Sequence, residues 1–121
     1  MASAAMIEND LKTALANIAG GRCYPDIAPD SPVFPLLIYQ QVGGRAYEYV
    51  NQSLPDHDHA RVQVVAWAKT RLEAVETMYM ARAAILAAIE PAQTYGGTIS
   101  IYNEDLKLYG SRQDFGIWFK P

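Results

Sequence analysis

Apolar side chains recur over residues 4–18 with the spacing of an amphipathic helix. The intervals between them are one, four, four and three residues, which places all of them on one face: Met6, Ile7, Leu11, Leu15 and Ile18. Gly20 and Gly21 follow, and glycine readily adopts the left-handed conformation that ends a helix. The pattern therefore predicts a first helix over residues 4–18.

A second helical pattern covers residues 70–89. It opens with Thr70 and, three residues later, Glu73, which is the spacing of a capping box: the threonine hydroxyl accepts a hydrogen bond from the glutamate amide. Pro91 follows the pattern and ends it, because proline cannot continue a helix. The side chains expected to face the core are Leu72, Val75, Met78, Tyr79, Leu86 and Ile89, with Ala83 allowing close approach.

Runs of β-forming residues predict five strands, over residues 36–42, 45–50, 60–68, 98–103 and 112–119. The third run alternates most clearly, with one face made of Val62, Val64, Ala66 and Ala68 and the other of Arg61, Gln63, Val65 and Trp67. The last strand is expected to place Phe115, Ile117 and Phe119 on one face.

The segments between these elements have the chemistry of connections. Residues 22–35 hold four prolines and are expected to form an extended connector, since proline fits neither a helix interior nor a central strand. Residues 51–59 form a polar loop, residues 93–97 a turn, and residues 104–110 a link between the last two strands.

The resulting order is helix, three strands, helix, two strands. Strands that follow one another through short links favour antiparallel pairing. Two helices packed on such a sheet give a two-layer α+β fold, with a mostly antiparallel sheet of about five strands. No linker or repeat divides the chain, so residues 1–121 are expected to form a single domain.

Composition and charge reduce the number of functional classes that fit the sequence. Half of the 121 residues are apolar, which supports a folded core, and the formal net charge is −3 with no basic run that would bind nucleic acid. No apolar stretch approaches the roughly 20 residues that span a bilayer, and the first residues lack the basic start of a signal peptide. We expect a soluble protein that binds neither membrane nor specific nucleic acid, and Cys23, the only cysteine, is expected to pack as a small apolar residue.

The one cluster with metal-ligand chemistry is Asp56-His57-Asp58-His59. If it continues the following strand, His57 and His59 point to one face and the two aspartates to the other, so the segment alone does not converge on an ion. We therefore predict no metal site and no cofactor, with His57 and His59 as the candidate ligands if an ion does bind. The alternatives are a solvated turn or a protein contact.

The sequence lacks the short motifs of nucleophilic, zinc-hydrolase and nucleotide-phosphate sites, and no catalytic residue is predicted. Loops carried on a rigid sheet often bind other proteins. The predicted protein contacts lie in the turn after the first strand and in the polar loop: Gly43, Gly44, Arg45, Asp56, His57 and Asp58.

Taken in order, these features resemble the tail completion, or tail terminator, family of long-tailed bacteriophages. The matching features begin with the first helix, which ends in Gly20-Gly21-Arg22 before Tyr24-Pro25. They continue with a strand after Pro35 that contains Ile38, Tyr39 and Gln40, then Ala60-Arg61-Val62-Gln63-Val64 with Trp67, the helix over residues 70–89, and Asp114-Phe115-Gly116-Ile117-Trp118-Phe119. The resemblance covers nearly the whole chain, although the Asp-His-Asp-His run is not typical of the family.

The resemblance implies a structural protein without catalysis or cofactor. It implies a homo-oligomeric ring, usually a hexamer, that caps the head-proximal end of the tail tube and helps to join tail to head. The implied partners are further copies of the chain, the tail tube protein and the head–tail connector protein. The implied location is the virion, at the tail–head junction, and the bacterial host cytoplasm during assembly.

Three other functions remain open at this point. The first is a different neck or minor tail protein of a phage or prophage. The second is a metal-dependent enzyme that uses Asp56 to His59, and the third is a small-ligand binding module, since two-layer sheets often hold ligands.

Overall fold

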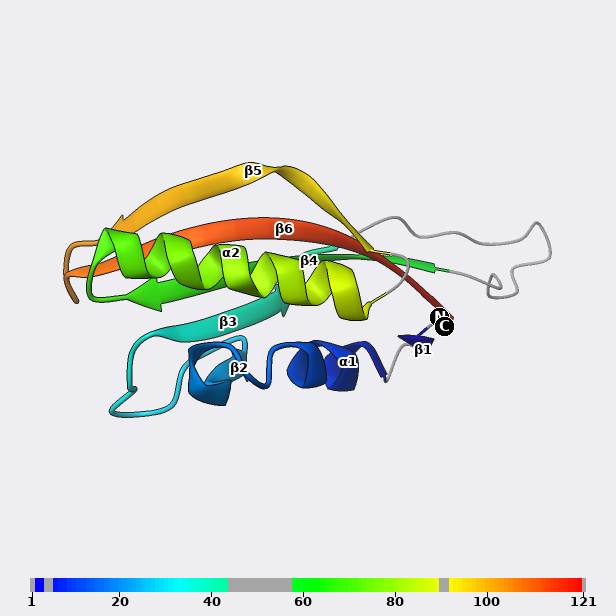
Figure 1. The fold of residues 1–121 in the computed structure, drawn as a ribbon, viewed down its shortest axis with the longest axis horizontal. Coiled ribbons are helices and arrows are strands. Elements are labelled where there is room, and N and C mark those ends of the chain that lie inside the picture. The colour runs from blue at the N-terminus through cyan, green and yellow to red at the C-terminus, as the bar shows by residue number, and fades with distance from the viewer. Residues whose placement is uncertain (1, 4–5, 44–57, 90–91, 121) are drawn as a thin grey trace.

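The fold is a twisted sheet with two helices on one face (Figure 1). The computed structural model describes residues 2–3, 6–43, 58–89 and 92–120. Their elements are β1 (Ala2–Ser3), α1 (Met6–Ala14), the 3₁₀ turn η1 (Ala19–Gly21), β2 (Cys23–Pro25), β3 (Leu36–Gln41), β4 (Asp58–Ala68), α2 (Arg71–Ala88), β5 (Ala92–Asn103) and β6 (Leu108–Lys120).

The sheet has the order β1-β6-β4-β3-β2, and β5 pairs with β6 along the edge that β4 leaves open. The long pairs β3–β4, β4–β6 and β5–β6 are antiparallel, whereas the short pairs β1–β6 and β2–β3 are parallel. The α+β class, the mostly antiparallel sheet and the order of helices and longer strands are therefore as predicted.

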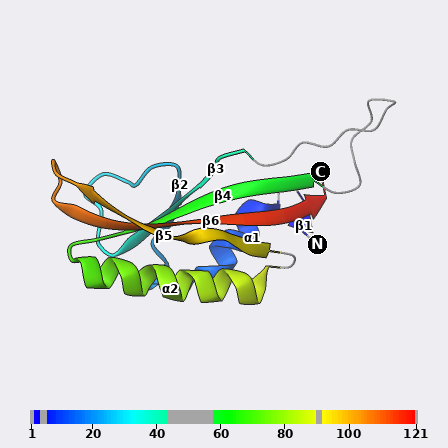
Figure 2. The same ribbon diagram turned by 90° about the horizontal axis from the view of Figure 1, so that it is seen from above.

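Both helices lie on the same side of the sheet, as Figure 2 shows. The core between the layers joins α1 and α2 to β3, β4 and β6, and its fully buried members include Leu11, Leu15, Leu37, Val64, Met78, Ile85, Phe115 and Ile117. Alternation along the strands explains this, because every second side chain of β4 and β6 points to the helices. The predicted division of residues 60–68 into two faces holds, and the face made of Val62, Val64, Ala66 and Ala68 is the one that packs on the helices.

The first helix is shorter than predicted. Its apolar stripe packs as expected, with Ile7, Leu11 and Leu15 buried. The α-helix nevertheless ends at Ala14, and the chain tightens into the turn η1, where Gly20 and Gly21 have positive φ angles. The expected end at residue 18 is wrong because the glycines terminate a separate 3₁₀ turn and not the helix itself.

The second helix begins as predicted. Thr70 is its N-cap, and the Thr70 hydroxyl accepts a hydrogen bond of 3.2 Å from the Glu73 amide. The predicted core face is right for Met78 and Ile89, which are buried, and wrong for Leu72, Tyr79 and Leu86, which are exposed, as is Ala83. The face that packs on the sheet consists of Ala74, Thr77, Met78, Ala81 and Ile85.

The physical reason is the small size of two residues on that face. Ala74 and Ala81 are almost fully buried and allow the helix to approach the sheet closely. The larger apolar residues lie on the flank that this approach leaves exposed. The hydrophobic pattern of the sequence gives most weight to large apolar side chains. It therefore predicted a helix face that is rotated away from the face that packs on the sheet.

The strands also extend beyond their predicted limits. β4 begins at Asp58, because Asp58 and His59 pair with Phe119 and Trp118 of β6, so the polar loop was predicted two residues too long. β5 runs through residues 93–97, where a turn was predicted. Gly96 adopts a positive φ of 69° there, and the strand absorbs the irregularity as a shift in register between Tyr95 and Ile99.

Two other features of the strands differ from the sequence prediction. The connector over residues 22–35 contains β2, a short parallel strand that is compatible with proline because Pro25 lies at a sheet edge. The strand predicted over residues 45–50 lies outside the described residues.

Candidate functional site

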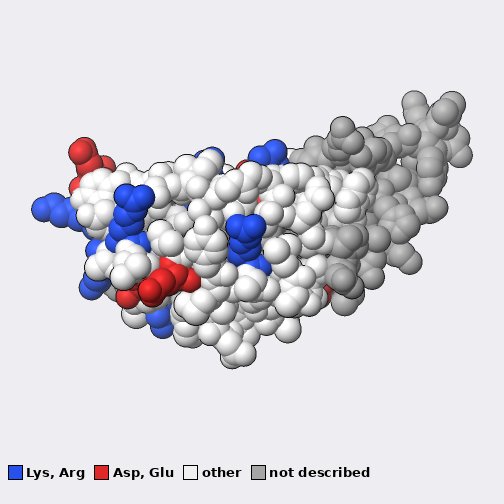
Figure 3. Space-filling view, turned by 45° about the horizontal axis from the view of Figure 1, so that its top comes forward, with Lys and Arg blue, Asp and Glu red and all other residues white. Residues whose placement is uncertain are grey.

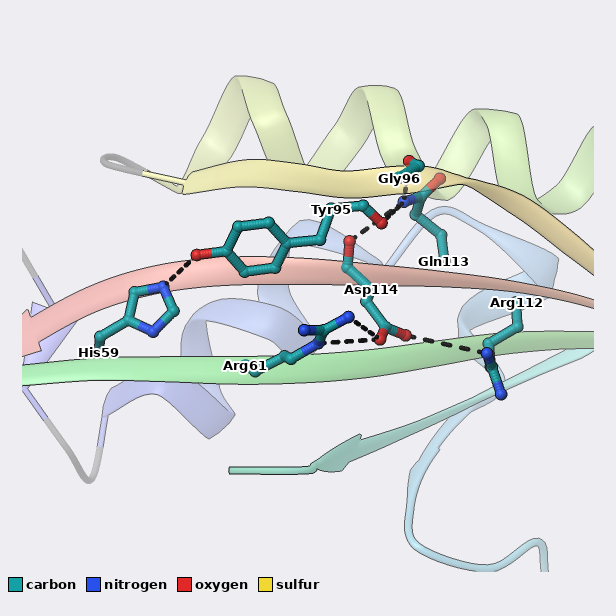
Figure 4. Close-up of polar contacts among 7 residues, drawn as sticks. All are labelled: His59, Arg61, Tyr95, Gly96, Arg112, Gln113 and Asp114. Atoms are coloured by element: carbon teal, nitrogen blue, oxygen red, sulfur yellow. Dashed lines mark hydrogen bonds and ion pairs between the residues drawn. The ribbon is translucent and has the colours of Figure 1, made fainter. Parts of the chain in front are cut away.

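The face of the sheet opposite the helices carries a cluster of polar side chains, drawn in Figure 4. We call it the open-face cluster: His59 and Arg61 of β4, Tyr95 of β5, and Arg112 and Asp114 of β6. Register places them together, since Arg61 pairs with Gly116 and Tyr95 with Asp114. Side chains at alternate positions of three adjacent strands thus meet on one surface.

Asp114 lies between the two arginines. The Arg61 guanidinium donates to Asp114 Oδ2 from both Nε, at 3.0 Å, and Nη2, at 2.9 Å. Arg112 Nε is 4.0 Å from the other carboxylate oxygen, Oδ1, which is the outer limit of an ion pair. Two guanidinium groups therefore share one carboxylate, and the group carries an excess of one positive charge.

His59 and Tyr95 form the second part of the cluster. The Tyr95 hydroxyl and His59 Nε2 are 2.7 Å apart, in hydrogen-bonding contact, and His59 is buried. The Trp118 ring meets the His59 ring edge to face, with centroids 4.9 Å apart. The Arg61 guanidinium lies 5.1 Å from the centre of the Tyr95 ring, a cation–π contact that joins the two parts.

The backbone below this contact has no room for a side chain. A Cβ added at Gly116 would lie 2.6 Å from the Tyr95 hydroxyl oxygen and 2.7 Å from His59 Nε2. Glycine is therefore required at this position for the His59–Tyr95 pair to lie flat on the sheet.

Gln113 stabilises the irregular part of β5 from the helix side. It is almost fully buried, and its Nε2 donates to the carbonyl oxygens of Tyr95, at 3.2 Å, and Gly96, at 3.0 Å. Those carbonyls lie where the β5–β6 register shifts, so the amide replaces ladder hydrogen bonds that the bulge loses. The bulge is thereby held in a fixed conformation.

The bulge opens a recess on the surface. The recess has a volume of about 510 Å³ and is lined by Arg61, Arg112, Asp114 and residues 95–99 of β5. A Cβ added at Gly96 or Gly97 would meet no atom within 4 Å, so the glycines leave this space open.

An apolar pocket of about 210 Å³ lies at the other end of the open face. Ala28, Pro32 and Phe34 of the proline-rich connector line it together with side chains of the strands and of the β5–β6 turn, among them Trp67 and Leu106. No helix of the described residues packs on this face of the sheet, and the connector covers part of it instead.

The predicted protein contacts fall at the boundary of the described residues. Gly43 is the last residue before the gap, with a φ of 101°, and its carbonyl accepts a hydrogen bond of 2.8 Å from the Arg61 amide. Asp58 is the first residue of β4. Gly44, Arg45, Asp56 and His57 lie outside the described residues.

Of the two candidate metal ligands, His59 is the one that the structure describes, and it is not grouped with further ligands among the described residues. His57 lies outside the described residues, and His59 faces the Tyr95 hydroxyl. Within residues 2–3, 6–43, 58–89 and 92–120, no group of three His, Cys, Asp or Glu side chains is placed to hold an ion.

Two buried ionisable groups lie in the core, away from the open face. Burial raises the pKa of the Cys23 thiol from 9.0 to about 11, so the thiol is neutral and unreactive near neutral pH. Burial, together with a hydrogen bond to the Glu8 carboxylate, raises the pKa of the Tyr39 hydroxyl above its usual range. Both groups contribute to packing.

Sequence reasoning missed the open-face cluster. Its residues come from three separate strands, and no motif links them. The alternation over residues 60–68 did separate Arg61 from the face of Val62 and Val64. The register that places Asp114 and Tyr95 beside Arg61 depends on strand pairing and on the bulge, which the sequence pattern does not specify.

Comparison with known proteins assigns the family. No curated protein matches the chain significantly. No helix in the described part of the chain is long and apolar enough to cross a membrane. The family model "Tail completion protein gp17" matches residues 10–120. This range contains the second half of α1, all of α2 and every strand from β2 to β6. The chain therefore belongs to the phage tail completion protein family, whose members are structural proteins of the tail.

Proposed function

We propose that this protein caps the head-proximal end of the phage tail tube as a ring of identical subunits and helps to join tail to head. The family match over residues 10–120 carries the proposal. In this proposal residues 1–121 act as one domain, and the partners are further copies of the chain, the tail tube protein and the head–tail connector protein. The protein is located at the tail–head junction of the virion, and in the host cytoplasm during assembly.

Exposed apolar side chains on the described surface support an assembly role. α2 exposes Leu72, Tyr79, Met80 and Leu86. Further exposed apolar side chains lie in the connector before β3, in β5 and in the turn after it: Ile27, Val33, Ile99 and Leu106. Leu72, Tyr79 and Leu86 are seven residues apart and share one side of α2, and contiguous exposed apolar surface is typical of surfaces that other proteins cover. A ring needs two different surfaces on each subunit that meet head to tail, and α2 and the open face are on opposite sides of the molecule.

The test is the mass of the purified chain in solution, measured by light scattering over a concentration series, with and without isolated tail tubes. The proposal expects either a ring-sized species of near six subunits or a monomer that pellets with tail tubes. A chain that stays monomeric and does not pellet with tubes contradicts the proposal. That result would favour a different neck or minor tail protein.

A further inference from the structure

The outer edge of β5 is a long strand edge without charge. β5 pairs with β6 along one edge, and no described strand pairs with the other. Its twelve residues include no charged residue and no proline. Edge strands are ordinarily protected from pairing with other chains by charges, prolines or bulges. The bulge between Tyr95 and Ile99 interrupts the edge once and leaves residues 99–103 without such protection.

The side chains of this stretch are accessible on both sides of the strand. Ile99, on the open face, is 47% exposed, and Tyr102, on the helix face, is 49% exposed. Ser100 lies between them and is also exposed. Figure 3, in which the β5 side is turned forward, shows the charged side chains of this face at one end and near its centre, with uncharged surface between them. A strand laid along this edge would meet backbone groups and uncharged side chains.

The recess of the open face begins at the same point of the strand. Ile99 is paired in register with Arg112, whose side chain lines the recess. Arg112 Nε and Asp114 Oδ1 are both buried, and neither has a hydrogen-bond partner among the described residues. Because Arg61 already engages Asp114 through two hydrogen bonds to Oδ2, the excess positive charge is associated with Arg112.

We propose that residues 99–103 of β5 bind an extended segment of another tail protein by strand addition, and that a carboxylate of this segment enters the recess and pairs with Arg112. The inference rests on the proposed function, since it names a surface by which the protein joins the tail. Strand addition supplies main-chain hydrogen bonds, and the recess selects a segment with an acidic side chain at the matching position.

Two observations favour a different protein over a second β5 strand as the occupant. β5 has no carboxylate, so a second copy of this strand has nothing to place in the recess. Pairing of β5 with β5 would also bring two positively charged recesses together and close a two-fold dimer, which does not propagate into a ring.

The first experiment measures backbone hydrogen exchange of the wild-type chain, free and bound to tails that were assembled without it. The expected result is slower exchange of the amides of residues 99–103 in the bound state, because a partner strand covers the edge. Bound protein whose residues 99–103 exchange as in the free state would overturn the inference but leave the proposed function standing. A wild-type chain that does not bind tails would overturn both.

The second experiment compares variants in the same binding assay. Ser100→Lys places a charge on the edge, and Ser100→Thr is its control because threonine retains strand propensity. Arg112→Gln removes the charge of the recess, and Arg71→Gln, which removes an exposed charge from the start of α2, is its control. Ser100→Lys and Arg112→Gln are expected to bind tails at least about tenfold more weakly than wild type. For Arg112→Gln this factor corresponds to the loss of one charged hydrogen bond. Both control variants are expected to bind as wild type.

Equal binding by all four variants would overturn the inference. Protection of residues 99–103 that appears at high concentration without tails would also overturn it, because the occupant would then be a second copy of this chain. Thermal melts establish that each variant folds. If one does not, the exchange measurement on the wild-type chain decides alone.

Discussion

Gly116 allows the His59–Tyr95 pair to lie against β6, and substitution by alanine tests whether that arrangement exists in solution. The new Cβ would be 2.6 Å from the Tyr95 hydroxyl oxygen and 2.7 Å from His59 Nε2, whereas unstrained contacts exceed about 3.4 Å. The two rings must therefore move apart or β6 must shift. Such overpacking costs about 1–3 kcal/mol, and the loss of the 2.7 Å hydrogen bond adds about 1 kcal/mol. Gly116→Ala is thus expected to lower the free energy of unfolding by about 2–4 kcal/mol.

Gly97→Ala is the matched control on the neighbouring strand. A Cβ at Gly97 meets no atom within 4 Å, and its φ angle lies outside the left-handed region. The change in the free energy of unfolding is expected to stay below about 1 kcal/mol, since the site accepts a side chain without strain. The assay is urea unfolding of both variants and wild type at one protein concentration, followed by tryptophan fluorescence. Equal stabilities of the two glycine variants would refute the close packing of His59 and Tyr95 over β6.

Three further predictions concern the core and the second helix. Ile85→Ala is expected to lower the free energy of unfolding by about 2–5 kcal/mol because Ile85 is fully buried. Leu86→Ala is expected to lower it by less than about 1.5 kcal/mol because Leu86 is 38% exposed. Urea unfolding of both variants distinguishes the observed helix face from the predicted one. Thr70→Ala removes the hydroxyl that caps the helix and is expected to cost about 0.5–2 kcal/mol by the same assay, with Thr70→Ser close to wild type. Burial raises the pKa of Cys23 to about 11, so the fold favours the neutral thiol; this contribution to stability is fully present below pH 9 and is lost as the pH rises through 11, so that stability falls with pH by at most about 2 kcal/mol more in wild type than in Cys23→Ala.

Each of these predictions has an outcome that contradicts it. Equal losses for Ile85→Ala and Leu86→Ala would mean that α2 does not pack as described. A wild-type stability for Thr70→Ala would mean that the capping hydrogen bond is absent in solution. Parallel pH profiles of wild type and Cys23→Ala would show that the thiol is not buried.

The fold followed from the sequence where a local signal determined the structure. The N-cap at Thr70 and the alternation of Val62 and Val64 with Arg61 were sufficient to place α2 and β4. These signals act over a few residues and depend on little else.

Features that depend on tertiary contacts did not follow. Which face of α2 is buried depends on how closely the helix approaches the sheet, and the alanines that set this distance carry little weight in a hydrophobic pattern. The path of β5 through Gly96 and Gly97 had the chemistry of a turn. It becomes a bulge because β6 continues alongside and Gln113 satisfies its carbonyls.

The family resemblance was visible in the order and spacing of elements, and the family match confirms it. The contact residues were harder to predict, because they depend on chains that the sequence does not contain. All six predicted contacts stay predictions: Gly43, Gly44, Arg45, Asp56, His57 and Asp58. The open-face cluster adds a candidate surface that only the strand register brings together.

The most direct test of the central proposal is electron cryomicroscopy of the head-proximal end of the tail in intact virions. The account predicts a ring of identical copies of this fold between the tail tube and the head–tail connector. A tail end at which this fold is absent, or virions that carry it only elsewhere in the tail, would contradict it.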